Sequence, residues 1–185
     1  MTKTDRRPGF SLIEMMFALG VCGVLAGVAV SRITAARPEV RADAAMRAVL
    51  SQIYQARALA IAQRRNMRLS FTNGNEVVIM REESGGGLTV VSAVTIDGGS
   101  RFVIINGMSD TPDAFGNAAA VAFGVASEVK FSAGGELINE NGAPINGSVF
   151  VALPNDALSA RAVTVRGSTG RVLGYRWDGG SWKIV

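Results

Sequence analysis

Hydrophobic residues follow a different period in each of three regions of the chain. Residues 10–31 are almost all apolar or small, and Glu14 is the one charged residue among them. Over residues 38–65 apolar positions recur every three or four residues, which is typical of a helix with one buried face. Residues 66–185 show short runs rich in β-branched residues, separated by Gly-, Asn- and Asp-rich turns. The pattern predicts an α+β fold in which a long N-terminal helix packs on a C-terminal antiparallel β domain.

The apolar run at residues 10–31 is long enough to span a membrane, because a helix needs about 20 such residues to cross a bilayer core. Lys3, Arg6 and Arg7 precede it, and basic residues favour the cytoplasmic side. A secretory signal peptide is one alternative, although its apolar stretch usually has about 7–15 residues. A simple membrane anchor is another. Neither explains Glu14, since a carboxylate in a lipid-facing helix costs about 2.5–3.5 kcal/mol.

The second helical segment, residues 32–65, is amphipathic. Its apolar stripe consists of Ala42, Ala45, Met46, Val49, Ile53, Ala56 and Ala60. The arginines of the segment lie mostly off this stripe, so we expect the stripe to pack on the β domain. Pro38 removes one helical hydrogen-bond donor. Two separate helices are therefore the alternative to one helix that runs from Phe10 to about Arg65.

The β region begins with a hairpin. The runs 67–71 and 76–80 flank Asn73-Gly74, a pair that accepts the positive φ angles of a tight turn. The remaining strand-like runs are 88–96, 101–105, 119–123, 128–132, 148–153, 161–166, 171–177 and 181–185. Their spacing and the turns between them predict one antiparallel β domain over residues 66–185.

Arginines are paired across the last long hairpin. If residues 167–170 form a four-residue turn, Arg166 faces Arg171 and Arg161 faces Arg176. Like charges directly opposite each other are unfavourable in a sheet, so these pairs indicate an acidic partner, exposure to solvent or an anionic ligand. The two pairs fall on opposite faces by strand alternation and need not form one patch. All four arginines are candidate contacts for DNA or another anion.

Composition narrows the function classes. The net charge of +4 is mild and does not require a nucleic-acid surface. The single cysteine, Cys22, cannot close an intrachain disulfide. Without histidine there is no Ser-His-Asp triad and no ordinary His/Cys zinc site, and no P-loop motif occurs. Asp110, Asp113 and Asn117 offer oxygens to Ca²⁺ but are more simply a turn. We expect no enzyme, no cofactor and no bound metal.

The segment Pro8-Gly9-Phe10-Ser11-Leu12-Ile13-Glu14 follows a short basic leader. It resembles the prepilin-type cleavage and methylation motif of type IV pilins and type II secretion pseudopilins. Residues 48–71, 128–137 and 162–172 look like parts of the GspH/FimT family of minor pilins and pseudopilins. The resemblance implies the type IV pilin-like fold, with four parts: a leader at 1–9, a transmembrane helix at 10–31, the amphipathic half of that helix at 32–65, and a periplasmic β domain at 66–185.

The resemblance also implies a functional site at the N-terminus. A prepilin peptidase would cut between Gly9 and Phe10 on the cytoplasmic side, and the new amine of Phe10 would be methylated. Glu14 needs a partner in apolar surroundings, and the Phe10 amine of a neighbouring subunit is the obvious one. A Glu14 that reaches the lipid headgroups without pairing is the alternative. The implied partners are the peptidase, other pilin or pseudopilin subunits and, before assembly, the inner membrane.

The leading interpretation is a structural minor pilin or pseudopilin that helps to start or cap a filament, in a type IV pilus or a type II secretion system. It would cross the inner membrane once, with the N-terminus cytoplasmic. The runner-up is a DNA-binding minor pilin of a DNA-uptake pilus. Some FimT-like minor pilins resemble DNA-uptake receptors that bind DNA through a Gly-Arg-x-Arg motif on this hairpin. Here Gly170-Arg171-Val172-Leu173 ends in leucine, which removes one phosphate contact. A third interpretation is a membrane-anchored periplasmic binding domain whose Gly9 stays uncut.

Overall fold

The structure is a computed structural model that describes residues 12–96, 98–124 and 128–185, with the backbone alone over residues 26–37. The chain divides into two compact units, Met1–Arg37 and Pro38–Val185. The predicted leader at residues 1–9 and the predicted cleavage and methylation site at Gly9 and Phe10 lie outside the described residues.

Helix α1 (Leu12–Gln63, 52 residues) continues through Pro38, so the alternative of two separate helices is wrong. Its last turn closes with a hydrogen bond from the Arg65 N–H to the Ala60 carbonyl at 3.2 Å. In this type of helix end the residue just past the helix takes a left-handed conformation. Here that residue is Arg64, with φ of 50°, at a position where glycine is the usual choice. The helix therefore ends two residues before the predicted boundary.

One sheet of unit 2, sheet A, has the strand order β3-β2-β1-β6-β7. Its strands are β1 (Met67–Thr72), β2 (Glu76–Glu82), β3 (Leu88–Thr95), β6 (Glu128–Phe131) and β7 (Leu137–Ile138). The predicted first hairpin is confirmed, because Thr72 pairs with Glu76 and both turn residues have positive φ, 54° at Asn73 and 71° at Gly74. Strand β7 was not predicted from the sequence.

The second sheet, sheet B, has the order β11-β10-β9-β8-β4, and β5 also pairs with β8. Its strands are β4 (Arg101–Phe102), β5 (Val121–Ala122), β8 (Gly147–Ala152), β9 (Arg161–Arg166), β10 (Arg171–Trp177) and β11 (Trp182–Ile184), and a short 3-10 helix, η1 (Ala157–Ser159), precedes β9. The predicted register of the last long hairpin is confirmed: Arg166 pairs with Arg171, and Arg161 pairs with Arg176. The expected strands at 101–105 and 119–123 shrink to two residues each.

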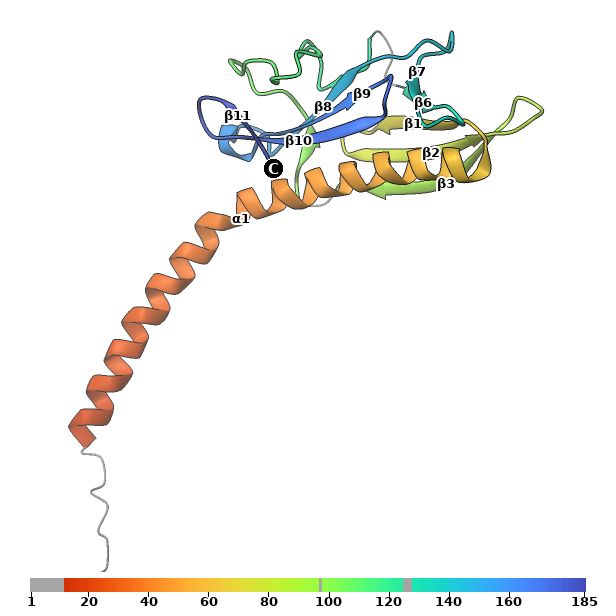
Figure 1. The fold of residues 1–185 in the computed structure, drawn as a ribbon. Helices are drawn as coiled ribbons and strands as arrows, with labels where there is room; N and C mark the ends of the chain where they lie inside the picture. The colour runs from red at the N-terminus through yellow and green to blue at the C-terminus, as the bar shows by residue number, and fades with distance from the viewer. Residues whose placement is uncertain (1–11, 97, 125–127) are drawn as a thin grey trace, which may run out of the picture. The chain divides into compact units, whose positions relative to one another are not determined.

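The main core lies between the Pro38–Gln63 part of α1 and both sheets (Figure 1). All seven residues of the predicted apolar stripe are buried, so the predicted packing face of the helix is confirmed. Six of them, all but Ala42, share one core cluster with Leu69, Ile79 and Val129 from sheet A and Val149, Val163 and Val165 from sheet B. Each fully buried Val or Ile stabilises the fold by about 1.5–3 kcal/mol, so this stripe holds the helix to both sheets.

Strand β3 forms one edge of sheet A and is largely exposed. Leu88 and Val90, in the first half of the strand, are both exposed, Val90 to 62%. The pairing with β2 contains a bulge, because Ile79 pairs with Ser92 whereas Met80 pairs with Val90. Val91 therefore lies opposite no residue of β2.

Candidate functional site

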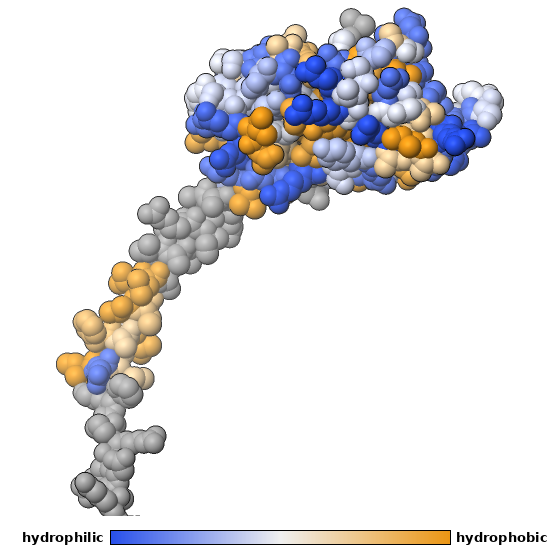
Figure 2. Space-filling model, in the orientation of Figure 1, coloured by the Kyte–Doolittle hydropathy of each residue, from blue (hydrophilic) through white to orange (hydrophobic). Residues whose placement is uncertain are grey.

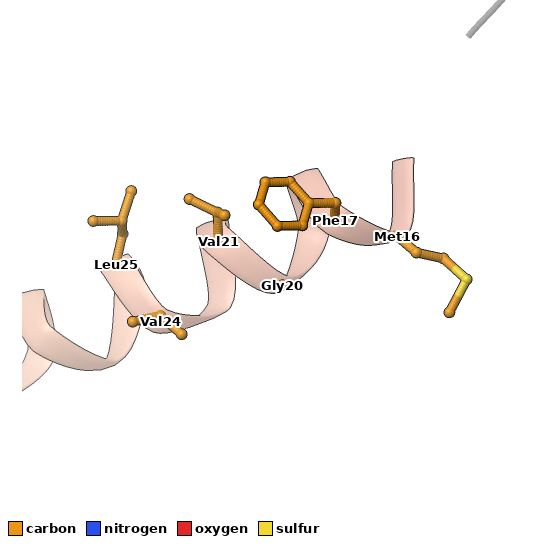
Figure 3. Close-up of a pocket in the computed structure, with 6 residues that line it drawn as sticks. All are labelled: Met16, Phe17, Gly20, Val21, Val24 and Leu25. Atoms are coloured by element: carbon orange, nitrogen blue, oxygen red, sulfur yellow. The ribbon is translucent and has the colours of Figure 1, made fainter. Parts of the chain in front are cut away.

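The N-terminal part of α1 presents apolar side chains on all sides. Large residues between Leu12 and Leu25 are mostly exposed, and Phe17 is 75% exposed. Figure 2 shows this part of unit 1 covered by hydrophobic residues, while the visible face of unit 2 is mixed. An apolar groove runs along one side of the helix, lined by Met16, Phe17, Gly20, Val21, Val24 and Leu25 (Figure 3). An exposed apolar surface of this extent is typical of an interaction site.

The predicted membrane span is described only in part, because residues 10 and 11 and the side chains of 26–31 lie outside the described residues. Among the residues that the structure does describe, no helix has a stretch with the length and mean hydropathy needed to cross a membrane. Glu14 lies in the first turn of α1, with an exposed side chain among these apolar residues. Its pairing with the Phe10 amine of a neighbour stays a prediction.

Arg161 is wrongly predicted as a DNA contact. Its side chain is 0% exposed, and its Nε donates to Asp43 Oδ1 at 2.6 Å. Its remaining donors bond main-chain carbonyls: Nη1 to Leu158 at 3.0 Å and Ala160 at 2.9 Å, and Nη2 to Glu39 at 3.5 Å. The guanidinium therefore fixes α1 to β9 and is not available to a ligand.

The other candidate arginines lie at two ends of the same hairpin. Arg166 and Arg171 flank the turn, and both are exposed. Arg166 lies 4.0 Å from Asp113 Oδ1 and 5.6 Å from the centre of the Phe115 ring. Arg176 is at the far end of the ladder, five residues along β10, or about 17 Å at 3.4 Å per residue. The four arginines therefore do not form one surface.

Arg57 has a structural role that the sequence did not reveal. Its Nε donates to the Gly135 carbonyl and its Nη2 to the Thr169 carbonyl, each at 3.0 Å. It thereby attaches the β6–β7 turn and the β9–β10 turn to α1. The close packing leaves no space at Gly170, where a Cβ would press against the Gly135 carbonyl and Arg57 Nε. In the sequence, the local signal for such a contact is the position of Arg57 directly after Ala56, a residue of the apolar stripe.

Asp113 anchors the long loop between β4 and β5 on sheet B. Its Oδ2 accepts hydrogen bonds from the Thr164 hydroxyl at 2.6 Å and the Tyr175 hydroxyl at 2.8 Å. Burial and the bond to Asp113 raise the pKa of Tyr175 to about 12. Asp110 closes a turn by accepting from the Thr111 and Gly116 amides, so the turn reading of this segment is confirmed.

A charged network covers the outer face of sheet A. Arg68 forms ion pairs with Glu82, Glu128 and Glu140 at 3.0, 3.1 and 2.7 Å. Lys130 pairs with Glu140 at 3.2 Å. Burial alone would raise the pKa of Glu82, but hydrogen bonds from Asn66 and Arg68 lower it below its usual value. The hydrogen bond from Arg68 likewise lowers the pKa of Glu140. The network ties the β7–β8 loop to β1 and β2.

Comparison with known proteins identifies the N-terminal segment. Residues 5–30 match the prokaryotic N-terminal methylation motif. No curated protein matches the chain. Among solved structures, the type IV minor pilin FimU of Pseudomonas aeruginosa is similar with a TM-score of 0.46 and 14% identity, over 70% of this chain and 84% of that one. The minor pseudopilin EpsH of the Vibrio cholerae type 2 secretion system is similar with a TM-score of 0.39 and 7% identity, over 78% and 96%. Gly9, Phe10 and Glu14 all fall within the matched residues, and the chain carries the prokaryotic N-terminal methylation motif.

Proposed function

We propose that this chain is a minor pilin or pseudopilin, a structural subunit of a type IV pilus or a type II secretion filament. One observation carries the proposal: the methylation motif at residues 5–30 stands at the start of a helix whose first part exposes apolar side chains and whose last part lies in the core of a β domain. The first part offers a surface for lipid and then for other helices. The second part holds the β domain on the outside of such an assembly.

The N-terminal residues have defined roles in this proposal. A prepilin peptidase cuts between Gly9 and Phe10 and the new amine is methylated. In the membrane the helix crosses once, with the N-terminus cytoplasmic and the β domain periplasmic. In the filament, Glu14 pairs with the Phe10 amine of a neighbouring subunit. A carboxylate left unpaired in an apolar bundle costs several kcal/mol, about 3–5 for a buried pair that loses one partner, so the pair sets the axial offset between subunits.

The experiment that tests the proposal is intact-mass spectrometry of the full chain, expressed with an active prepilin peptidase, beside Gly9→Ala. We expect the wild type to lose residues 1–9 and gain one methyl group, and Gly9→Ala to keep its leader. Glu14→Ala is the matched control for assembly, because it should be cut normally and yet fail to enter a filament. An unprocessed wild-type chain, with a known substrate fully cut in the same cells, would refute the proposal and favour a membrane-anchored periplasmic binding domain.

A further inference from the structure

The outer face of sheet A, which is turned away from α1 (Figure 1), has two halves of different chemistry. Over β1 and β6 it carries Arg68, Lys130 and the carboxylates that pair with them. Over β2 and β3 it carries mostly apolar side chains. The strand register places five of them there, which we call the apolar patch: Val78, Met80, Leu88, Val90 and Ala93.

The pairing across the strands shows that the patch faces outward. Residues directly opposite each other in a ladder lie on the same face of a sheet. Arg68 pairs with Met80, and Met80 pairs with Val90. The alternate positions Val77 and Ile79 are buried in the core beside α1. The patch therefore shares the outer face with Arg68 and its ion pairs.

The bulge in β3 turns part of the patch outward. Ser92 faces α1, because its hydroxyl donates to Gln52 Oε1 at 3.1 Å. In a regular strand Val90 and Leu88 would face α1 as well, since side chains alternate. The bulge shifts the ladder by one position, so that Val90 lies opposite an outward-facing residue of β2. Bulges often re-aim side chains in this way, and this one leaves Leu88 50% and Val90 62% exposed.

The charges beside the patch are already paired with one another. Arg68 pairs with Glu82, Glu128 and Glu140, and Lys130 pairs with Glu140. A charged partner would gain little from groups that are compensated, and covering them would cost desolvation energy. What this face lacks is a cover for its apolar half. The partner surface that fits is therefore uncharged and apolar, and it leaves the ion pairs in water.

The patch is small compared with a complete protein interface. A standard interface has about 20–30 residues on each side, whereas the patch has the five residues that the register places there. Such a contact does not hold two molecules together in dilute solution. It can hold molecules that are already confined together, because confinement raises their effective concentration. Two copies of this chain inserted in one membrane are confined in this way, and each brings an uncharged apolar patch.

One twofold arrangement of two copies covers both patches and leaves the ion pairs in water. When two outer faces stack with the twofold axis parallel to the strands, β2 of one copy lies over β3 of the other, and β1 and β6 extend past that edge. An axis across the strands would instead press the charged halves together and bury them. In the first arrangement Val90 of one copy faces Met80 of the other, because the two residues are at the same level of the ladder.

We propose that two copies of this chain pack their apolar patches against each other while both are inserted in the membrane. The inference rests on the proposed function, because the membrane is what confines the two copies. The contact covers Leu88 and Val90 in each copy before the subunits join a filament.

Cysteine crosslinking of the full chain in proteoliposomes measures this contact. In a Cys22→Ser background, we would reconstitute Met80→Cys and Val90→Cys chains together and treat them with a short bismaleimide. The control is Ser168→Cys in both chains, an exposed position in the β9–β10 turn. We expect the Met80–Val90 product to form about tenfold faster than the control product. We also expect its formation to slow when the same chains are diluted in dodecyl maltoside.

A matched pair of charge substitutions tests whether the patch is responsible. Leu88 and Leu158 are 50% and 51% exposed, and Leu88 alone of the two lies in the patch. Leu88→Asp places an unpaired carboxylate in the contact and should slow crosslinking about tenfold, whereas Leu158→Asp should leave the rate unchanged. Equal slowing by both substitutions, or equal rates for the patch pair and the Ser168 pair, would overturn the proposal.

The same variants separate this inference from the proposed function. A chain that prepilin peptidase cuts after Gly9, but whose patch crosslinks no faster than the Ser168 site, overturns the paired patches and leaves the pilin proposal standing. A chain that is never cut or inserted, yet crosslinks in solution with the same dependence on Leu88, keeps the paired patches and refutes the role of the membrane. Crosslinking in cells to a different protein, and not to a second copy, refutes the second copy as the partner.

Discussion

The buried pair between Arg161 and Asp43 gives the sharpest test of how α1 is held to sheet B. The perturbation is Asp43→Ala, which removes the carboxylate and leaves the Arg161 guanidinium in place, with its side chain 0% exposed. Removing one partner of a fully buried ion pair costs about 3–5 kcal/mol. Two features reduce that figure here. The Asp43 side chain is 31% exposed, and main-chain carbonyls still accept from the guanidinium. We therefore expect a loss of about 2–3 kcal/mol in the free energy of unfolding.

The assay is urea unfolding of the full chain in dodecyl maltoside, followed by tryptophan fluorescence, because Trp177 and Trp182 are both buried in sheet B. With an m-value of about 1–3 kcal/mol per molar for a small domain, the midpoint should fall by about 0.7–3 M. Glu39→Ala is the matched control. Arg161 contacts the main-chain carbonyl of that residue, so the change should stay within about 0.5 kcal/mol.

A double-mutant cycle decides whether the pair itself is responsible. Replacing both residues, Asp43→Ala with Arg161→Met, removes the buried charge together with its partner, and such replacements are often neutral. The cost of Asp43→Ala should therefore largely disappear in the Arg161→Met background. The reasoning is refuted if Asp43→Ala costs the same in both backgrounds, or if it costs less than about 0.5 kcal/mol in the wild type.

Three further predictions follow from local geometry. Hydrogen bonds from Asn66 and Arg68 lower the pKa of Glu82, and the hydrogen bond from Arg68 lowers the pKa of Glu140. Their contribution to the free energy of unfolding is therefore full above the ordinary pKa of 4.5 and is lost as pH falls below it. On acidification, the urea midpoint of Arg68→Met should fall less than that of the wild type. Arg64→Gly should raise the free energy of unfolding by about 0.5–1 kcal/mol, because φ at this helix end is 50°, and an unchanged thermal midpoint would contradict this. Burial and its aspartate partner raise the pKa of Tyr175 to about 12, so its contribution to the free energy of unfolding is full below pH 10 and is lost as pH rises through 12. Tyr175→Phe should lower the free energy of unfolding by about 1–2 kcal/mol at neutral pH, and stability should then fall less steeply at alkaline pH than in the wild type.

Features that depend on residues close together in the sequence were predictable. The seven-residue stripe of α1 follows the helical period, and all seven residues are buried. The register of the β9–β10 hairpin followed from its four-residue turn, because the turn length fixes which residues pair. In both cases the relevant information lies within a few residues of the predicted feature.

Features that depend on distant residues were not predictable. Arg161 was interpreted as an exposed anion contact because its partner, Asp43, is 118 residues away. The Arg68 network likewise joins residues up to 72 positions apart. Strand β7 has only two residues, too few to show an alternating pattern. The prepilin-type motif could be recognised from the sequence because its residues are contiguous, and residues 5–30 match the prokaryotic N-terminal methylation motif; the cleavage at Gly9 and the pairing of Glu14 stay predictions.

The bulge in β3 affects how readily copies of the chain aggregate at high protein concentration. The strand has no charged residue and no proline, the features that normally protect a free edge from pairing with another chain. The bulge at Val91 divides the edge into two regular stretches, Leu88–Val90 and Ser92–Thr95. Each is shorter than the roughly six-residue segments that stack into amyloid-like sheets. The bulge thus acts as the gatekeeper against aggregation that a lysine or proline provides in other edge strands.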